Sequence, residues 1–297
     1  MCTPKDPITD VEETQMLKIA IPNKGSLSEE AVRLIREAGY NCRRYSRELI
    51  VFDSRNQVEF VFLRPRDIAI YVNSGILDMG VTGRDLALDS GVDVVELLPL
   101  GFGKSDFAYA VPADSDLLPD EFNGLRIATS YPRLVAQDLQ KRGLQAQIIR
   151  LDGAVEISIR LGVADVIADV VQTGRTLKAA GLQVVGQPLL QSEAILAARS
   201  REVEHSQTVL SFLDRIRGIV VAREYVMVEY DIPETMLEMA CVITPGIESP
   251  TVSPLSKKGW VAVKSMSPKR DVNPIMDNLG KIGAKGIIVT DIRTCRI

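Results

Sequence analysis

The feature that most constrains this fold is a repeated order of short apolar strand, turn marked by Gly or Pro, and amphipathic helix. Residues 17–22 (LKIAIP) predict a buried strand, and the turn at 23–25 (NKG) leads into a helix that ends at Gly39. We expect Ser26 to cap this helix and Glu29, three residues later, to complete a capping box. Strands linked by helices pair in parallel, so this order predicts an α/β fold.

The same order continues through two lobes. In the first, strands are predicted at 48–52, 59–63, 78–82 and 93–98, with helices from Pro65 and near Arg84. In the second, strands are predicted at 106–111, 125–130, 145–151 and 164–171, with helices from Pro132 and over 153–161. Segments 182–187 and 192–199 return the chain, and a helix over 203–217 is expected to cross back to the first lobe. Such double crossing is typical of two lobes around a cleft.

The order of elements changes after about Arg223. Strands are predicted at 225–231, 249–253, 259–265 and 286–292, and helices at 233–242 and 271–282. This βαββαβ order describes a ferredoxin-like domain. The predicted division is a flexible leader (1–15), a first lobe (16–105 with 200–222), a second lobe (106–199) and a C-terminal domain (223–297).

Composition and charge narrow the class of protein. With 46% hydrophobic and 25% charged residues, the chain is neither collagen, a coiled coil nor wholly disordered. The longest stretch without a charge, 179–192, is shorter than the roughly 18 apolar residues of a membrane span, and the start of the chain lacks a signal-peptide core. We therefore expect a cytoplasmic protein with no membrane partner. The net charge of −4 argues against non-specific nucleic-acid binding.

The cysteines and the single histidine exclude several kinds of site. Cys2, Cys42, Cys241 and Cys295 are far apart and form no CxxC pair, so we expect reduced thiols and neither a disulfide framework nor a zinc site. A Ser-His-Asp triad is disfavoured unless His205 alone supplies its base.

The segment 156–177 carries the strongest signal for chemistry. An apolar strand ends at Asp169, and the turn after it places Thr173, Gly174 and Thr176 at the start of a helix. Gly174 allows close approach to the backbone, and free N–H groups, the helix dipole and two hydroxyls favour a phosphate. Asp169 is suited to ribose hydroxyls or a hydrated Mg²⁺. The alternative is that Thr173 only caps a helix and Asp169 is a solvated turn residue.

The full spacing of this segment is more specific than the turn alone. The positions Glu156, Gly162, Ala164, Ile167, Asp169, Thr173, Gly174, Thr176 and Leu177 match, without gap or mismatch, the signature of the ATP phosphoribosyltransferases, which begin histidine biosynthesis. The chain resembles this family from about Met16 to its end. The other matching motifs are IPNKGSL (21–27), LRPRDIAIYV (63–72), GVTGRDL (80–86), TSYP (129–132), LDGAVE (151–156) and ITPGIESPTVSPL (243–255).

The resemblance implies both a fold and a reaction. Similar enzymes of the long, hexameric form have two catalytic lobes that resemble periplasmic binding proteins, followed by a ferredoxin-like (ACT-like) regulatory domain. They transfer the 5-phosphoribosyl group of phosphoribosyl pyrophosphate (PRPP) to N1 of ATP, which gives N1-(5-phospho-β-D-ribosyl)-ATP and pyrophosphate, and histidine inhibits them. The strand order by itself does not distinguish these lobes from the commoner phosphoribosyltransferase fold.

The chemistry of this transfer gives the basic residues a role. C1′ of the ribose becomes cationic while the departing pyrophosphate gathers negative charge, so the protein must stabilise both charges. Lys24, Arg64 and Arg66 lie where strands turn into helices, where they are placed to meet phosphates, and Mg²⁺ would complete the neutralisation. The alternative is that they are three solvated surface cations. Because N1 of adenine already has a lone pair, no strong general base is needed.

The resemblance also implies three sets of site residues. The catalytic set is Lys24, Arg64, Arg66, Glu156 and Asp169; the PRPP set is Asp169, Thr173, Gly174, Arg175 and Thr176; the ATP set is Gly83, Asp85, Leu86 and Tyr131. Mg²⁺ is expected to bind mainly through substrate phosphates, with Glu156 and Asp169 as candidate protein ligands. Two alternatives remain, namely that Asp85 is a first-turn acid stabilised by the helix dipole, and that Glu156 lies in a helix and pairs with Arg160.

In the C-terminal domain, the resemblance places a histidine site at Asp231, Thr251 and Ser253. On the residues alone, polar side chains beside prolines are ordinary turn formers. The expected partners are ATP and PRPP as substrates, histidine as inhibitor, and further copies of the chain, from dimer to hexamer.

Two other functions compete with this one. A two-lobed small-molecule binding protein with an appended sensor domain would need neither Mg²⁺ nor a phosphate turn, and the motif DVVQTGRTL at 169–177 counts against it. A phosphoribosyltransferase that acts on another base would share the phosphate turn. Incubation with PRPP, Mg²⁺ and each of several bases separates the three.

Overall fold

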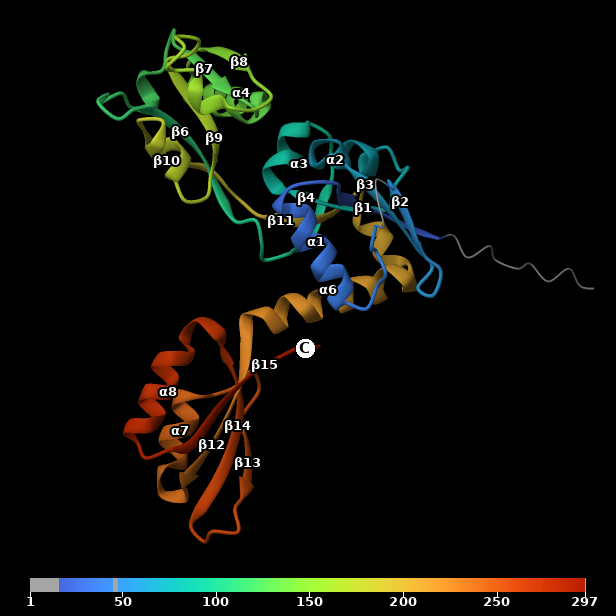
Figure 1. The fold of residues 1–297 in the computed structure, drawn as a ribbon, viewed down its shortest axis with the longest axis vertical. Helices are drawn as coiled ribbons and strands as arrows, with labels where there is room; N and C mark the ends of the chain where they lie inside the picture. The colour runs from blue at the N-terminus through green and yellow to red at the C-terminus, as the bar shows by residue number, and fades with distance from the viewer. Residues whose placement is uncertain (1–15, 45–47, 297) are drawn as a thin grey trace, which may run out of the picture.

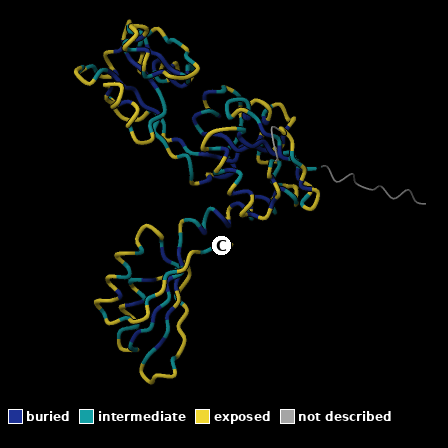
Figure 2. Tube along the Cα trace, viewed as in Figure 1, coloured by how far each residue is buried: buried dark blue, intermediate teal, exposed yellow. Residues whose placement is uncertain are grey.

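The computed structural model describes residues 16–44 and 48–296 and contains two α/β lobes and a C-terminal domain (Figure 1). The predicted leader, 1–15, lies outside the described residues. Each of the three units has its own buried core, as the dark segments within each of them show (Figure 2). The expected architecture of two α/β lobes followed by a ferredoxin-like domain is confirmed.

The first lobe is built on a six-stranded sheet of order β2-β3-β1-β4-β11-β5. Its strands are β1 (Leu17–Pro22), β2 (Ile50–Asp53), β3 (Val58–Leu63), β4 (Met79–Gly83), β5 (Val95–Pro99) and β11 (Ala194–Ala198), and its helices include α1 (Ser26–Glu37), α2 (Pro65–Asn73) and α3 (Arg84–Ser90). β1 pairs in parallel with β3 and with β4. The turns that follow these three strands therefore meet at one edge of the sheet.

Two expectations for this lobe are wrong. Ser26 is the first residue of α1 and Gly25 precedes it as N-cap, with no side-chain cap, so the predicted capping box is not formed. Gly25 has φ of 79°, a conformation that glycine adopts readily, and this turn starts the helix one residue early. Residues 194–198 are expected in the second lobe, but β11 lies in the first sheet, antiparallel between β4 and β5.

The second lobe is built on a five-stranded sheet of order β10-β6-β9-β7-β8. Its strands are β6 (Ser105–Pro112), β7 (Arg126–Thr129), β8 (Gln147–Arg150), β9 (Val166–Val171) and β10 (Leu182–Ser192), and its helices are α4 (Pro132–Arg142) and α5 (Arg175–Ala179), with a 3-10 turn at Pro119–Glu121. β7 pairs in parallel with β8 and β9, so the ends of these strands also share one edge. The helix predicted over 153–161 is wrong, because only a 3-10 turn at Val155–Ile157 forms after Gly153 and the left-handed Ala154.

The chain crosses between the lobes twice, from β5 to β6 and from β10 to β11 (Figure 1). After a 3-10 turn at Arg201–His205, α6 (Gln207–Glu224) returns to the first lobe as predicted. It packs there through the buried side chains of Val209, Phe212, Leu213, Ile216 and Ile219.

The C-terminal domain has the order β12 (Tyr225–Pro233), α7 (Leu237–Ile243), β13 (Thr251–Pro254), β14 (Trp260–Pro268), α8 (Val272–Lys281) and β15 (Lys285–Asp291), with 3-10 turns at Glu234–Met236 and Lys269–Asp271. Its antiparallel sheet has the order β13-β14-β12-β15, which is the ferredoxin-like arrangement. Both helices lie on the same side of the sheet (Figure 1), and burial alternates along β12 and β14. One face of the sheet therefore carries the core, and neither helix covers the other.

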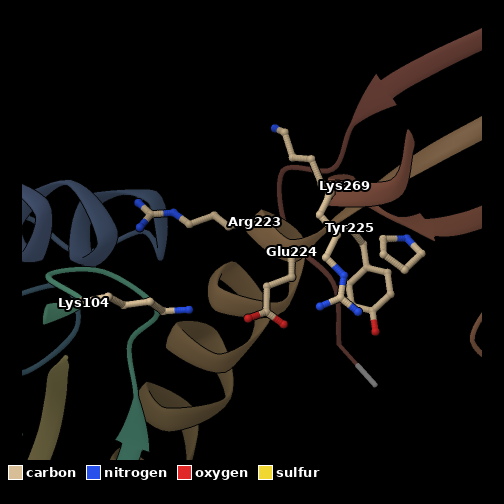
Figure 3. Close-up of a pocket in the computed structure, with 7 residues that line it drawn as sticks. Lys104, Arg223, Glu224, Tyr225 and Lys269 are labelled. Carbon is tan, nitrogen blue, oxygen red and sulfur yellow. The ribbon is translucent and has the colours of Figure 1, made fainter. Parts of the chain in front are cut away.

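The C-terminal domain is joined to the first lobe without a linker, since α6 ends at Glu224 and β12 begins at Tyr225. A pocket of about 440 Å³ opens at this joint, where Lys104 lies opposite Lys269 on either side of the end of α6 (Figure 3). The C-terminal tail packs back on α6, where the N–H of Cys295 donates to the carbonyl of Gly218 at 2.9 Å.

Two further expectations concern the whole chain. Cys42, Cys241 and Cys295 are free, and Cys2 is not among the described residues. Within 16–44 and 48–296, no helix combines the length and apolar character that crossing a bilayer requires.

Candidate active site

The predicted phosphate turn follows β9 and borders a cavity of about 310 Å³. This cavity is lined by Glu156, Asp169, Val170, Val171, Gln172, Thr173, Gly174, Thr176 and Leu177. The side chains of Thr173 and Thr176 are exposed, whereas Arg175 begins α5 and does not line the cavity. The predicted PRPP set thus surrounds one cavity, with Arg175 as the exception.

Gly174 shapes this turn through its backbone conformation. It precedes α5 as N-cap with φ of 68°, in the left-handed region that L side chains rarely adopt. A Cβ added there would meet Cγ1 of Val171 at 3.9 Å, an ordinary contact distance. The turn therefore requires glycine for its positive φ, while the space beside it stays open for a ligand.

Asp169 is a partly buried carboxylate within β9 and not a solvated turn residue. Its Oδ1 accepts a hydrogen bond from the N–H of Val170 at 2.8 Å. Burial raises the pKa of Asp169, and the hydrogen bond from Val170 lowers it. The negative charges of Glu156 and Asp85 raise this pKa, whereas the positive charge of Arg66 lowers it. The net shift of this pKa is upward. The protein by itself therefore does not fully stabilise the negative charge of Asp169, and a cationic or hydroxyl-bearing ligand would stabilise it further.

Glu156 shares this cavity with Asp169 but does not lie in the expected helix. It occupies the 3-10 turn Val155–Ile157 and lines the cavity. Among the described residues, it makes no ion pair with Arg160, so that alternative is not supported.

A second cavity, of about 510 Å³, lies between the lobes. The first lobe contributes Lys24, Arg64, Pro65, Arg66, Asp67 and Leu86, and the second contributes Tyr131, Arg150 and Asp152. Lys24 follows β1 and Arg64 follows β3, and the two strands end side by side because Pro22 pairs with Leu63. The parallel pairing of distant strands is what gathers the predicted basic residues here.

Tyr131 forms the aromatic wall of the interlobe cavity. It is 9% exposed, and the guanidinium Cζ of Arg66 lies 4.6 Å from the centre of its ring. The ring of Phe107 packs against it with centroids 5.1 Å apart. Burial, and then the charge and hydrogen bond of Asp85, raise the pKa of Tyr131 well above its usual range, so the phenol stays protonated.

Asp85 is buried behind this wall and ties α3 to the chain crossing. It is 7% exposed, and its Oδ1 accepts from the hydroxyl of Ser192 at 2.8 Å, while its own N–H donates to that hydroxyl at 3.0 Å. A Cβ at Gly83 would collide with the Asp85 carboxylate, so glycine is required for this placement. The structure thus brings the four predicted ATP residues, Gly83, Asp85, Leu86 and Tyr131, into one region. Of these, Leu86 and Tyr131 line the cavity, whereas Gly83 and Asp85 do not.

Sequence reasoning missed Arg150 and Asp152. Arg150 ends β8, next to the matching motif LDGAVE, and faces the interlobe cavity, with its Nε 3.7 Å from an oxygen of Asp152. Its position at a strand end, directly before a recognised motif, was the signal that could have found it.

The described residues contain no group of three or more His, Cys, Asp or Glu side chains that would hold a metal ion. Glu156 and Asp169 are the acidic side chains that share the phosphate-turn cavity. Two carboxylates fit an ion such as Mg²⁺, which keeps several waters and binds through substrate phosphates.

The residues predicted to bind histidine all lie on the face of the C-terminal sheet that neither helix covers. Asp231 pairs with Ala262 and Ala262 with Ser253, so Asp231 and Ser253 stand in one row across three strands. Two strand spacings separate them by roughly 10 Å. Thr251 stands in the next row with Lys264, and it lines a cavity of about 440 Å³ that Asp231 does not reach. Lys264 pairs with Glu229 at 2.7 Å in that row.

Comparison with known families gives two matches. Residues 64–218 match the family described as ATP phosphoribosyltransferase, and residues 222–294 match the one described as HisG, C-terminal domain. Together they extend from the second strand-to-helix turn of the first lobe almost to the C-terminus.

Individual relatives agree with this result. The "ATP phosphoribosyltransferase" of Salinibacter ruber is 61% identical over 283 residues, which is 95% of this chain and 100% of that protein. The protein of the same name from Rhodococcus jostii is 55% identical over 281 residues, 95% of this chain and 99% of that protein. Among solved structures, the "ATP phosphoribosyl transferase (HisG:HisZ) complex from Thermotoga maritima" has a TM-score of 0.62 at 26% identity, covering 70% of this chain and 100% of that chain.

Proposed function

Because the chain belongs to the ATP phosphoribosyltransferase family, in the long form with a C-terminal domain, we propose how its two cavities divide the reaction. The enzyme transfers the 5-phosphoribosyl group of PRPP to N1 of ATP and releases pyrophosphate, the first step of histidine biosynthesis. Its substrates are ATP and PRPP. The transfer reaction expected from the sequence is confirmed, and feedback inhibition by histidine stays a prediction. In our proposal, one cavity binds PRPP and the other binds ATP.

PRPP binds at the phosphate turn in our proposal. The observation that carries this assignment is the open cavity beside Gly174, into which the exposed hydroxyls of Thr173 and Thr176 are free to donate. Asp169 and Glu156 border the same space, where their negative charges suit ribose hydroxyls and a developing cation at C1′. Arg175 does not line this cavity, and in our proposal its backbone N–H and its positive charge at the start of α5 stabilise the bound phosphate.

ATP binds in the interlobe cavity, with the adenine near Leu86 and Tyr131. The support is the combination of an apolar and aromatic wall with basic side chains from both lobes: Lys24, Arg64, Arg66 and Arg150. Positive charge from both sides stabilises the triphosphate and the pyrophosphate as it leaves. Attack by N1 needs orientation and charge stabilisation rather than removal of a proton, since the nucleophile is a lone pair.

We assign Mg²⁺ as the cofactor, held mainly by substrate phosphates. Glu156 and Asp169 would hold it from the protein side, and the raised pKa of Asp169 supports a carboxylate that gains from a nearby cation. The ion would neutralise the pyrophosphate as negative charge builds on it.

The C-terminal domain is assigned to feedback inhibition by histidine and to assembly of several copies of the chain. The support is the sheet face that carries Asp231, Thr251 and Ser253 and that neither helix of the domain covers. The carboxylate of Asp231 suits the ligand's ammonium group, and the two hydroxyls suit its polar atoms. A cytoplasmic location fits the two substrates, which are cytoplasmic metabolites.

The assignment is tested by steady-state kinetics on the purified full chain with PRPP, Mg²⁺ and ATP. We expect Thr173→Ala to raise KM for PRPP and Tyr131→Ala to raise KM for ATP, each with little change in the other constant. If the two effects are exchanged, or if neither appears, the division between the two cavities is wrong. Product formation with another purine in place of ATP would favour the rival phosphoribosyltransferase.

A further inference from the structure

Asp89 is a buried carboxylate to which neither the sequence nor the proposed function assigns a role. It lies in the last turn of α3, in the first lobe, and is 9% exposed. Buried charges are rare unless they are paired, because removing them from water is costly. Its partners therefore indicate what it does.

One oxygen of Asp89 caps a helix of the other lobe. Its Oδ1 accepts hydrogen bonds from the backbone N–H groups of Arg133, at 2.9 Å, and Leu134, at 3.2 Å. These are the first N–H groups of α4, because Pro132 has none, and the N-cap residue Tyr131 supplies no side-chain cap. The α4 helix thus takes its cap from α3, across the gap between the lobes.

The other oxygen reaches the nucleotide side of the cavity. Oδ2 of Asp89 lies 3.5 Å from Nη1 of Arg66, whose guanidinium stacks over the ring of Tyr131. A cavity of about 320 Å³ borders this group and shares Arg66, Asp67, Leu86 and Arg150 with the larger interlobe cavity. Asp89 therefore contacts Arg66 directly and also contacts the start of α4, the helix that Tyr131 precedes.

The two lobes approach closely at this point. Gly91, two residues after Asp89, has φ of 71°, and a Cβ there would collide with the guanidinium of Arg133. The contact with α4 is thus made by the C-terminal end of α3 as a whole, and Asp89 supplies its hydrogen bonds.

We propose that Asp89 is a positioning residue for the nucleotide: by capping α4 from the opposite lobe, it sets where Tyr131 stands relative to Arg66 and Leu86. This inference rests on the proposed placement of ATP in the interlobe cavity. Because the cap joins the lobes rather than two parts of one lobe, its loss changes the spacing of the cavity walls more than the stability of either core.

Two substitutions separate the cap from the charge. Asp89→Asn keeps an oxygen at the same distance along the side chain, so it preserves the cap and removes the charge. Asp89→Glu keeps the charge but places the carboxylate one methylene too far into a buried site. The exposed Asp93 provides the matched control, Asp93→Asn, on the loop after the same helix. Each variant is measured as the full chain, with its melting curve as a test of folding.

For ATP, we expect KM to rise about tenfold in Asp89→Glu, the size expected for loss of a helix cap, and less than about threefold in Asp89→Asn. The Asp93→Asn control should match the parent, and kcat and KM for PRPP should stay within about threefold in all variants. If Asp89 contributed to stability alone, its substitution would lower the melting temperature and leave KM for ATP unchanged.

Any other order of the ATP constants, including equal values for the two Asp89 variants, overturns the proposal. Should Asp89→Glu fail to fold, Asp89→Ala, which removes the acceptor without adding volume, takes its place under the same criterion. Tyr131→Ala, measured in parallel, tests the placement of ATP separately. If it leaves KM for ATP unchanged, the proposed cavity is wrong, whereas a raised KM together with the wrong order of Asp89 variants refutes only the role of Asp89.

Discussion

Replacing Thr173 by valine removes one hydroxyl from the phosphate turn at nearly constant volume. The side chain is exposed and borders the open cavity, so the change removes a donor to PRPP without leaving a void in a core. A hydrogen bond to a charged group contributes about 1.5 to 3 kcal/mol. Because water competes at an exposed position, we expect the lower end of this range, which corresponds to an increase of about tenfold in KM for PRPP.

The assay is initial velocity against PRPP at saturating ATP, with binding checked by calorimetry in the absence of ATP. Thr235→Val, at an exposed position in the C-terminal domain, is the matched control and should leave the constants unchanged. Thr173→Val should melt like the parent. Unchanged affinity for PRPP in a folded Thr173→Val protein would refute the assignment of this turn, and an equal loss in the control would point to a general effect.

Three further changes test other parts of the structure. Arg150→Ala should raise KM for ATP several-fold while the melting temperature stays unchanged, since the guanidinium is exposed in the interlobe cavity; unaltered kinetics would remove Arg150 from the site. Asp169→Asn should lower kcat yet raise the melting temperature at neutral pH. The folded-state pKa of Asp169 lies above its unfolded value, so the charged form costs stability, and this gain should vanish as the pH falls below the ordinary carboxyl pKa. Asp231→Asn and Thr251→Val should stay active and resist histidine, which velocity against histidine concentration measures; full inhibition of both would move the effector site elsewhere.

Local patterns in the sequence predicted most elements of this fold. The strand, turn and helix at the start of the first lobe depend on the alternation of apolar residues, and such patterns act over one or two turns of chain. The βαββαβ order of the C-terminal domain was predicted in the same way, and its sheet order confirms it. Local reasoning failed where glycines changed the backbone: Gly25 started α1 at Ser26, and Gly153 with Ala154 left only a 3-10 turn at Val155–Ile157.

The phosphate turn was predictable because all of its parts lie within 169–177. The strand end, the positive-φ glycine and the helix start are neighbours in sequence, so local residues alone predict the shape of the turn. Lys24 and Arg64 were recognised as basic residues at strand ends, but only the pairing of β1 with β3 places them at one cavity.

By itself, the sequence determined most element types, the family and the strand-turn-helix order of 169–177, because these depend on residues that are close along the chain. The tertiary structure decided which sheet each strand joins and which side chains meet across the lobes. It placed β11 in the first sheet and brought Arg150 to the interlobe cavity. It also brought the carboxylate of Asp89 to the start of α4, where that carboxylate accepts from the N–H of Arg133, 44 residues later in the chain. Such contacts depend on the free energy of packing segments that are distant in sequence. The local pattern of apolar and polar residues does not specify which of these segments pack together.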